Sequence, residues 1–322
     1  SGNQNHGTIN GATWSEDAYV PPVPPVPGGN NSLSFDGEDD YVNFGAINNR
    51  ELNDGSFEFW IKSNAESEGN LLLNQDCDGC EFSTGDWGFN IGNINNRKVG
   101  FWAVNSSGSA DLISESLNDE EWYYIVGTRN SETGVMRLYV NGFLVDENNG
   151  PTGLIYNNLN TVFGKYASVD RGYCEVKLHF VRMWNVVLEE SEIQSYMYTP
   201  PAEDEPGLVG YWNFNEGEGA ALTDLSENGN DGTIYGAIWS GDGPVFGCAD
   251  PYAENFDPEA NTNDGSCEYS QEPVTFTKQN YADPSLAENQ DRITNNVWIT
   301  RGDSQPLYNA ALESSYQDES IS

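Results

Sequence analysis

The sequence predicts an all-β protein: an antiparallel two-sheet β-sandwich of the jelly-roll type, with one short helix and a small disulfide-closed loop. The first observation that predicts this fold is the pattern of apolar and polar residues. From residue 32 to residue 187, short runs that alternate apolar and polar residues are separated at regular intervals by clusters of Asn, Gly, Asp and Ser. Composition is the second, because 12% of the residues are aromatic and 34 are glycine, which suits rings packed on strands and glycines at turns.

The strands are predicted from the alternation itself. The clearest candidates are residues 57–61, 99–103, 122–126 and 136–140. Asn141-Gly142 follows the last of these and is typical of a two-residue type I′ hairpin, because both positions need positive φ. The chain is therefore expected to return as a further strand after this pair.

A later strand is expected to have one solvated face. Its core-facing residues would be Val176, Leu178 and Phe180, and its water-facing residues would be Lys177 and His179. A helix is predicted next, over residues 189–198. Its apolar stripe is Ile193, Tyr196 and Met197, and a Pro-Pro pair ends it.

Charge is the most extreme property of the chain, with 13 Lys and Arg against 51 Asp and Glu and a formal net charge of -38. A field of this sign repels nucleic acid, which is excluded as a partner. So many carboxylates repel one another in a compact fold unless cations screen or bridge them. We therefore expect calcium as the counter-ion and an extracellular or cell-surface location. No apolar run is long enough to span a membrane.

Five cysteines are present. Cys248 and Cys267 flank one Asp/Asn-rich loop and are predicted to form a disulfide, which implies an oxidising compartment. For Cys77 and Cys80, two arrangements stay open: a local loop staple, or a bridge from Cys174 to one of the pair. A zinc or redox site is disfavoured because no second CxxC exists.

One segment occurs twice. Residues 1–17 and 226–242 are identical at eleven of seventeen positions without a gap. The first copy is expected to be the tail of a preceding unit, in a piece of a larger array. The predicted organisation is this tail with a Pro-rich linker (1–29), the sandwich (30–199), returning strands that complete it (200–246), a Cys-flanked loop (247–269) and the start of a further β unit (270–322).

Two groups of residues could bind calcium through hard oxygen ligands. In the Cys-flanked loop the candidate ligands are Asp250, Asn255, Asp257, Asn261, Asn263 and Asp264. The alternative for this loop is a solvated Asp/Asn turn closed by the disulfide. The second group is Asp36, Asp39 and Asp40, which should either bind a cation together or lie apart on exposed turn positions.

Aromatic residues in or beside predicted loops are the candidates for ligand binding, because sugar rings present apolar C–H faces to aromatic rings. They are Trp87, Trp102, Tyr166 and Tyr173. Packing in the core is the alternative for each of them. Three further tryptophans, Trp60, Trp184 and Trp212, are assigned to the core outright. No carboxylate pair, Ser/His/Asp arrangement or phosphate-binding loop is recognisable, so catalysis is not expected.

About half of the chain resembles a known family. Residues 32–42, 57–62, 122–124, 137–142, 162–164 and 181–185 carry, in order, motifs similar to those of bacterial laminin-G-like, concanavalin A-like jelly rolls. The resemblance implies two packed antiparallel sheets and, in many members, a calcium ion held by loops at one edge near the ligand. The chain departs from the family at His179-Phe180, where Asp-Glu is usual. Residues 247–269 resemble thrombospondin type 3 calcium repeats.

These observations predict a non-catalytic adhesion or glycan-binding module of a large extracellular surface protein, stabilised by calcium. The expected partner is a glycan or a cell-surface protein. The alternative is a structural repeat subunit of an extracellular filament or a viral or phage-like fibre. In that case the subunits would associate with one another through β edges.

Overall fold

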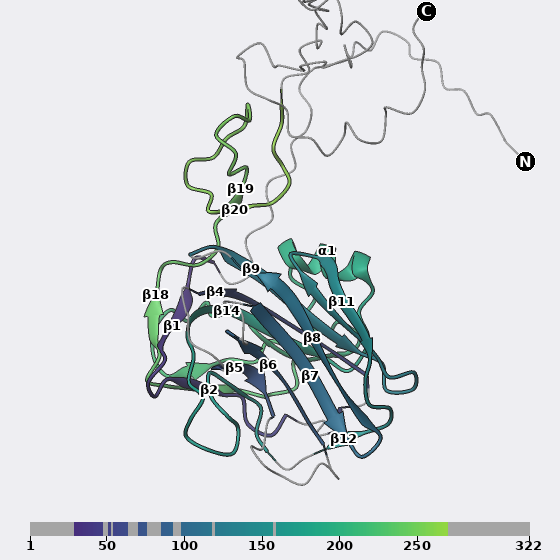
Figure 1. The fold of residues 1–322 in the computed structure, drawn as a ribbon. Coiled ribbons are helices and arrows are strands. Elements are labelled where there is room, and N and C mark those ends of the chain that lie inside the picture. The colour runs from purple at the N-terminus through teal and green to yellow at the C-terminus, as the bar shows by residue number, and fades with distance from the viewer. Residues whose placement is uncertain are drawn as a thin grey trace, which may run out of the picture. The chain divides into compact units, whose positions relative to one another are not determined.

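In a computed structural model of the protein, the described residues are 29–47, 51–52, 54–63, 70–75, 85–92, 98–117, 120–156 and 159–269. They form the predicted antiparallel two-sheet sandwich, with one short helix at its side (Figure 1). The first copy of the repeated segment, the Pro-rich linker, Cys77, Cys80 and the predicted further β unit lie outside the described residues.

The strands of the first sheet run, in spatial order, β11 (Phe143–Asn149), β10 (Val135–Val140), β9 (Trp122–Arg129), β4 (Gly55–Lys62), β14 (Glu175–Trp184), β1 (Ser32–Asp36) and β18 (Ile238–Ser240). A further strand of this sheet, β15 (Leu208–Trp212), pairs with the second half of β14. All these pairings are antiparallel. The predicted strands 57–61, 122–126 and 136–140 are confirmed as parts of β4, β9 and β10.

The strands of the second sheet run β16 (Ala221–Leu222), β17 (Gly232–Tyr235), β2 (Tyr41–Asn43), β13 (Val162–Phe163), β5 (Asn70–Asn74), β6 (Asp86–Ile91), β7 (Lys98–Asn105) and β8 (Gly108–Ser116). Two short pairs stand apart from both sheets: β3 (Glu51–Leu52) with β12 (Ile155–Tyr156), and β19 (Phe246–Gly247) with β20 (Thr262–Asn263). The strands between residues 208 and 240 thus pair with both sheets.

The main core lies between the two sheets and includes Phe35, Phe59, Phe89 and Trp212. A second apolar cluster includes Trp60, Trp184 and residues of α1 (Glu190–Tyr198). Glu189 caps this helix through a capping box, and Ile193 and Met197 are its buried residues. The helix therefore packs on the sheet through the predicted apolar stripe, and the three core tryptophans are confirmed as buried.

The predicted hairpin is also confirmed. Asn141 and Gly142 have φ of 51° and 79°, the left-handed values that a type I′ turn requires. They join β10 to β11, with Val140 paired to Phe143. The turn is local in sequence, which is why it could be predicted without knowledge of the fold.

The predicted faces of β14 are wrong after its midpoint. His179 is buried, not solvated, and Phe180 belongs to the second cluster while Leu178 and Val181 belong to the main core. A register shift between His179 and Val181 in the pairing with β4 marks a β-bulge, which reverses the alternation of side chains. From His179 onward the face opposite the core is buried, because the second cluster covers it.

The disulfide between Cys248 and Cys267 is confirmed. Cys174 is buried and free, so the predicted alternative in which it bridges to Cys77 or Cys80 is wrong. Burial raises the pKa of the Cys174 thiol, which makes it an inert core residue. None of the helices in the described part of the chain is long and apolar enough to cross a membrane.

Asp242 follows β18 and bonds to two lysines of the first sheet. We expect these bonds to make the free energy of unfolding depend on pH in the acidic range. Its carboxylate accepts hydrogen bonds from Lys62, at 3.1 Å, and from Lys177. Partial burial alone would raise the pKa of Asp242, but the hydrogen bonds and charges of the two lysines outweigh it and lower the pKa. Because the pKa is lower in the folded than in the unfolded state, the ionised carboxylate stabilises the fold above about pH 4, and this contribution is lost as pH falls through the folded pKa.

We therefore expect Asp242→Asn to lower the free energy of unfolding by about 0.5–1 kcal/mol at pH 7, after allowance for solvent screening, and by less near pH 2. Urea denaturation between pH 2 and pH 7 measures both values. Glu147→Gln, which removes the exposed partner of Arg137, is the control and should change stability less. If Asp242→Asn lowers the free energy of unfolding equally at pH 2 and pH 7, the ionised carboxylate of Asp242 is not what stabilises the fold.

Candidate functional site

Three connections between the two sheets meet at one end of the sandwich. They leave the ends of β1, β13 and β17, and each crosses to the opposite sheet. Cross-strand pairs hold these ends together, since Asp36 is paired with Glu175 and Tyr235 with Tyr41. The connecting segments 37–40, 164–174 and 236–237 therefore gather at this end, which we call the loop end.

The first connection carries the acidic cluster. Asp36, Asp39 and Asp40 offer ligand oxygens that all lie within 4.8 Å of one another. Asp36 and Asp39 are exposed, and Asp40 is buried. The amide of Asp36 donates to Asp40 Oδ2 at 2.9 Å, and the amide of Glu38 donates to Asp36 Oδ1 at 2.8 Å. Of the two arrangements predicted for these aspartates, the structure shows the convergent one.

Asp40 is held against two glycines of the other connections. A β-carbon at Gly236 would lie 2.0 Å from Asp40 Oδ1, and one at Gly164 would lie 2.9 Å from the Asp40 carbonyl oxygen. Burial raises the pKa of Asp40, and the carboxylates of Asp36 and Asp39 raise it further against the hydrogen bond from the Asp36 amide. A cation among the three carboxylates would relieve this repulsion, and a set of hard oxygens suits calcium.

Beside the acidic cluster lies an aromatic pair that was not predicted from the sequence. Tyr41 and Tyr235 stack with ring centroids 4.4 Å apart and an interplanar angle of 7°. Lys165 Nζ lies 4.4 Å from the centroid of the Tyr41 ring and forms an ion pair with Asp170. Tyr235 remains 43% exposed. The loop end thus offers a flat aromatic surface next to carboxylates.

Two predicted ligand-binding residues lie in the 164–174 connection. Both Tyr166 and Tyr173 are half-buried. Arg171 Cζ lies 5.3 Å from the centroid of the Tyr166 ring. Burial raises the pKa of Tyr173, and the charge of Asp170 raises it further. The structure therefore brings Tyr166 and Tyr173 to the same end as the predicted metal ligands Asp36 and Asp39.

The predicted role of Trp87 in stacking on a sugar is wrong, because Trp87 is a core residue with 2% exposure. Its ring stacks on Phe57 at 4.1 Å, and its Nε1 donates to Gln75 Oε1 at 3.1 Å. Trp102 lies one strand away on the other face of the sheet and is half-buried, with Cη2 only 2.4 Å from where a β-carbon of Gly88 would be. The Trp102 ring thus lies against Gly88. The role of Trp102 in binding a sugar stays a prediction.

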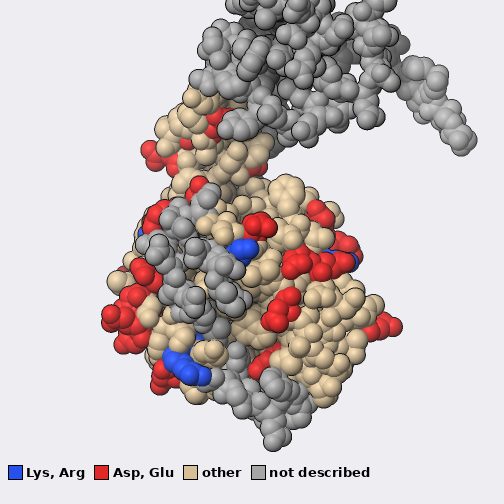
Figure 2. All heavy atoms as spheres, viewed as in Figure 1, with Lys and Arg blue, Asp and Glu red and all other residues tan. Residues whose placement is uncertain are grey.

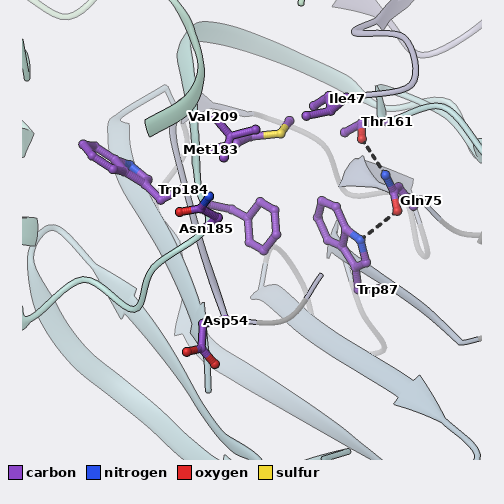
Figure 3. Close-up of a pocket in the computed structure, with 10 residues that line it drawn as sticks. Ile47, Asp54, Gln75, Trp87, Thr161, Met183, Trp184, Asn185 and Val209 are labelled. Carbon is purple, nitrogen blue, oxygen red and sulfur yellow. Dashed lines mark hydrogen bonds between the residues drawn. The ribbon is translucent and has the colours of Figure 1, made fainter. Parts of the chain in front are cut away.

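A small cavity lies beside Trp87 (Figure 3). Its volume is about 40 Å³. Gln75 lines it, with Nε2 donating to Thr161 Oγ1 at 2.8 Å while Oε1 accepts from Trp87 (Figure 3). This volume has room for water but not for a sugar ring. The cavity is therefore not a candidate for glycan binding.

The side chains of the Cys-flanked loop close local turns. The Oδ1 atoms of Asp250, Asp257 and Asp264 accept backbone amides two residues ahead, at 2.9, 2.9 and 2.8 Å, and Asn263 Oδ1 accepts the amide of Gly265 at 3.0 Å. Asn255 Nδ2 donates to the Ser266 carbonyl oxygen, and Asn261 Oδ1 accepts the amide of Val245. These contacts suit the solvated-turn alternative, and calcium binding by this loop stays a prediction.

Carboxylates are spread over the face of the molecule drawn in Figure 2, with few Lys or Arg among them. At the loop end, Lys165 and Arg171 stand near four aspartates, namely Asp36, Asp39, Asp40 and Asp170. The local potential is therefore negative, and a ligand of this end should be a cation, a neutral molecule or both together.

Residues 36–194 match the family described as the concanavalin A-like lectin/glucanases superfamily. A Bacteroides ovatus protein that carries the provisional name of carbohydrate binding protein has the same fold, with 17% identity and a TM-score of 0.52 over 65% of this chain. The match spans 59% of the length of that protein. A search of curated proteins finds no match.

Two further solved structures are less similar. The native heptameric SAP-like pentraxin from Limulus polyphemus is 13% identical, with a TM-score of 0.41, 52% of this chain covered and 81% of that chain. The CBM40 domain of the Ruminococcus gnavus IT-sialidase, bound to α2,3-sialyllactose, is 15% identical, with a TM-score of 0.42, 50% of this chain covered and 94% of that chain. The two-sheet sandwich seen in the structure agrees with the match of residues 36–194 to the concanavalin A-like lectin/glucanases family model, and it extends beyond that match through β15–β18.

Proposed function

We propose that this sandwich is a non-catalytic glycan-binding module of an extracellular surface protein, and that its binding site is the loop end. The observation that carries the proposal is the convergence of three carboxylates with the Tyr41–Tyr235 stack. An exposed aromatic ring stacks on the C–H face of a sugar, while carboxylates or a bound cation take its hydroxyl groups. Neighbouring Tyr173 and Tyr166 would widen the contact.

Calcium is the proposed partner of the acidic cluster. Asp36, Asp39 and Asp40 can supply part of a shell of six to eight oxygens. The remaining positions are open to backbone oxygens, water or sugar hydroxyls. When bound, the ion would offset the burial and the repulsion that raise the pKa of Asp40 and would stabilise the native state, because the fold fixes the three carboxylates within 4.8 Å of one another and the unfolded chain does not.

The test is a glycan array and a thermal melt, each run with calcium and with chelator. We expect glycan binding in calcium, its loss in chelator, and a Tm higher by several degrees with calcium. The variant Asp36→Asn/Asp39→Asn should lose both the calcium-dependent rise in Tm and glycan binding. As control, Asp111→Asn removes an exposed carboxylate on β8 and should keep both. A Tm that is unchanged by calcium would remove the ion from the proposal.

The structural-repeat alternative is favoured by one observation. Edge strand β11 exposes three consecutive apolar residues, Phe143, Leu144 and Val145. Such an edge can pair with another strand. If the array shows no glycan binding, while sedimentation shows assembly that Phe143→Lys prevents, the protein is a structural repeat and not a glycan-binding module.

A further inference from the structure

The second copy of the repeated segment closes the sandwich by pairing with both sheets. Within residues 226–242, β17 pairs with β2 of the second sheet, and β18 pairs with β1 at the edge of the first sheet (Figure 1). These residues lie beyond the family match, which ends at residue 194. We call residues 226–242 the closing segment and residues 1–17 the first copy.

Three polar side chains fasten the start of the closing segment, and the first copy has each of them. Ser226 Oγ and Asn230 Nδ2 donate to the Val209 carbonyl oxygen at 3.1 and 2.8 Å, and Asn228 Nδ2 donates to the Leu208 carbonyl oxygen at 3.1 Å. These bonds attach the segment to β15. The equivalent residues of the first copy are Ser1, Asn3 and Asn5.

The end of the closing segment is fastened by residues that the first copy shares as well. Trp239 Nε1 donates to the Gly219 carbonyl oxygen at 2.8 Å, and the Asp242 carboxylate accepts from Lys62 and Lys177. The equivalent residues are Trp14 and Asp17. The first copy can therefore form the same bonds with the two lysines of a sandwich.

The buried positions and the turn are also the same in both copies. Gly232, Ile234 and Ala237 are buried, and Gly236 has φ of +78° in the turn between β17 and β18. The first copy has Gly7, Ile9, Ala12 and Gly11 at these positions. Thr233 is identical too, and nothing in the described part of the structure explains this, since Thr233 is exposed. The first copy can thus pack where the closing segment packs.

The six positions at which the copies differ are all exposed, so none of the differences changes the packing of the core. Two of these positions have a left-handed backbone. Glu227 has φ of 60°, where the first copy has Gly2, and Gly229 has φ of 69°, where the first copy has Gln4. Because glycine adopts such angles most easily, one change favours the first copy and the other the closing segment.

Contacts made by two of the differing residues would be lost. Asp231 Oδ1 accepts the Asp224 amide at 3.0 Å, and the Tyr235 ring stacks on Tyr41. The first copy has His6 and Asn10 at these positions. The closing segment is also joined to its own sandwich by the chain. It should therefore keep its place until it is released or weakened, and only then give way to the first copy.

The linker after the first copy favours a second molecule as the acceptor. Asp242 lies beside the start of β1, since its carbonyl oxygen accepts from Ser32 Oγ at 3.0 Å and the next amide, of Gly243, donates to the Asn30 carbonyl oxygen at 2.9 Å. Within one molecule, residues 17 and 30 would therefore have to meet. The Pro-rich stretch 20–27 between them favours an extended conformation about 25 Å long, which holds its ends apart.

We propose that the first copy of one molecule replaces the closing segment in the sandwich of a second molecule when that closing segment is released. The sandwich then binds residues 1–17 of another copy of the chain along β1 and β2. Exchange of an identical element joins two molecules through contacts that the fold already uses. The inference concerns assembly and does not rest on the proposed glycan binding.

The first test disables the two copies one at a time in the full chain. Ile234→Asp places a carboxylate in the core and weakens the closing segment, Ile9→Asp makes the equivalent change in the first copy, and a double variant disables both. Thermal melts and sedimentation are measured at several protein concentrations. We expect Ile9→Asp to melt as the unaltered protein does. Ile234→Asp should form oligomers, with a Tm that rises with protein concentration, because a second molecule supplies the missing segment. The double variant should have a lower Tm that does not depend on concentration.

The second test traps the exchanged segment with a disulfide. Ser34 and Ile238 are Cα partners in the pairing of β1 with β18, and the first copy has Thr13 at the position of Ile238. In the Ile234→Asp background, Thr13→Cys/Ser34→Cys should give disulfide-linked oligomers on non-reducing electrophoresis. Ser34→Cys without Thr13→Cys is the control for the native cysteines and should give none. Adding Ile9→Asp should abolish the cross-link.

Two outcomes would overturn the proposal. If Ile234→Asp and the double variant have equal Tm values at every concentration, the first copy does not replace the closing segment. A cross-link that forms within one molecule would rule out a second molecule as the acceptor. Neither outcome bears on glycan binding, which the array tests separately.

Discussion

Arg182→Met is expected to lower the free energy of unfolding by about 3–5 kcal/mol, because it leaves a buried carboxylate without its cation. The side chains of Arg182 and Glu58 are both 0% exposed and lie 3.2 Å apart. Arg182 Nη1 also donates to the Tyr196 carbonyl oxygen of α1 at 2.8 Å, so the pair ties the helix to the sheet. Burial raises the pKa of Glu58, and Arg182 is the largest influence opposing it.

Loss of the cation should also change how stability depends on pH. In Arg182→Met, folded Glu58 keeps a proton that the unfolded chain releases above about pH 4.3. The loss of stability should therefore grow as pH rises from 4 toward the folded pKa. Urea denaturation at several pH values measures it.

Two control variants show how much of the loss comes from leaving the Glu58 carboxylate buried without its cation. Glu58→Gln/Arg182→Met should recover part of the loss, because a neutral amide oxygen still accepts from Trp184 Nε1, which lies 2.8 Å from Glu58 Oε1. Arg137→Met removes an exposed pair with Glu147 and should cost less than about 1 kcal/mol. If Arg182→Met costs no more than Arg137→Met, the buried pair does not hold the helix in place.

The features that could be predicted from the sequence are those that neighbouring residues determine. The Asn141-Gly142 turn, the apolar stripe of α1 and the crowding of Asp36, Asp39 and Asp40 each depend on a few adjacent residues. The bulge after His179 could not be predicted, because the register of β14 against β4 creates it. The burial of His179 likewise depends on a second cluster that comes from distant strands.

The candidate site was predicted only in part for the same reason. Tyr41 and Tyr235 belong to strands far apart in the sequence, and only the pairing of β2 with β17 makes them neighbours. Trp87 and Trp102 are both strand residues, and alternation alone cannot say which of them faces the core. The structure decides it: Trp87 points between the sheets and Trp102 points away.

The second large effect is expected for Gly236→Ala. Gly236 has φ of +78°, and a β-carbon there would lie 2.0 Å from Asp40 Oδ1. The left-handed conformation costs alanine about 1–2 kcal/mol, and displacing buried Asp40 adds about 1–3 kcal/mol. We therefore expect a loss of about 2–5 kcal/mol in the free energy of unfolding. The first copy of the segment also has glycine here, at Gly11, which fits a requirement of the fold.

Gly219→Ala is the control that separates the backbone cost of the left-handed conformation from the clash with Asp40. Gly219 has φ of +82°, but no atom lies within 4 Å of its β-carbon position, so this variant carries the backbone cost alone, about 1–2 kcal/mol. Urea denaturation gives the difference between the two variants, which is the cost of moving Asp40. Because Asp40 would also shift away from Asp36 and Asp39, Gly236→Ala should lose the proposed calcium-dependent rise in Tm while Gly219→Ala keeps it. Equal losses of stability in the two variants would mean that the turn does not hold Asp40, and the acidic cluster would then depend on its own connection alone.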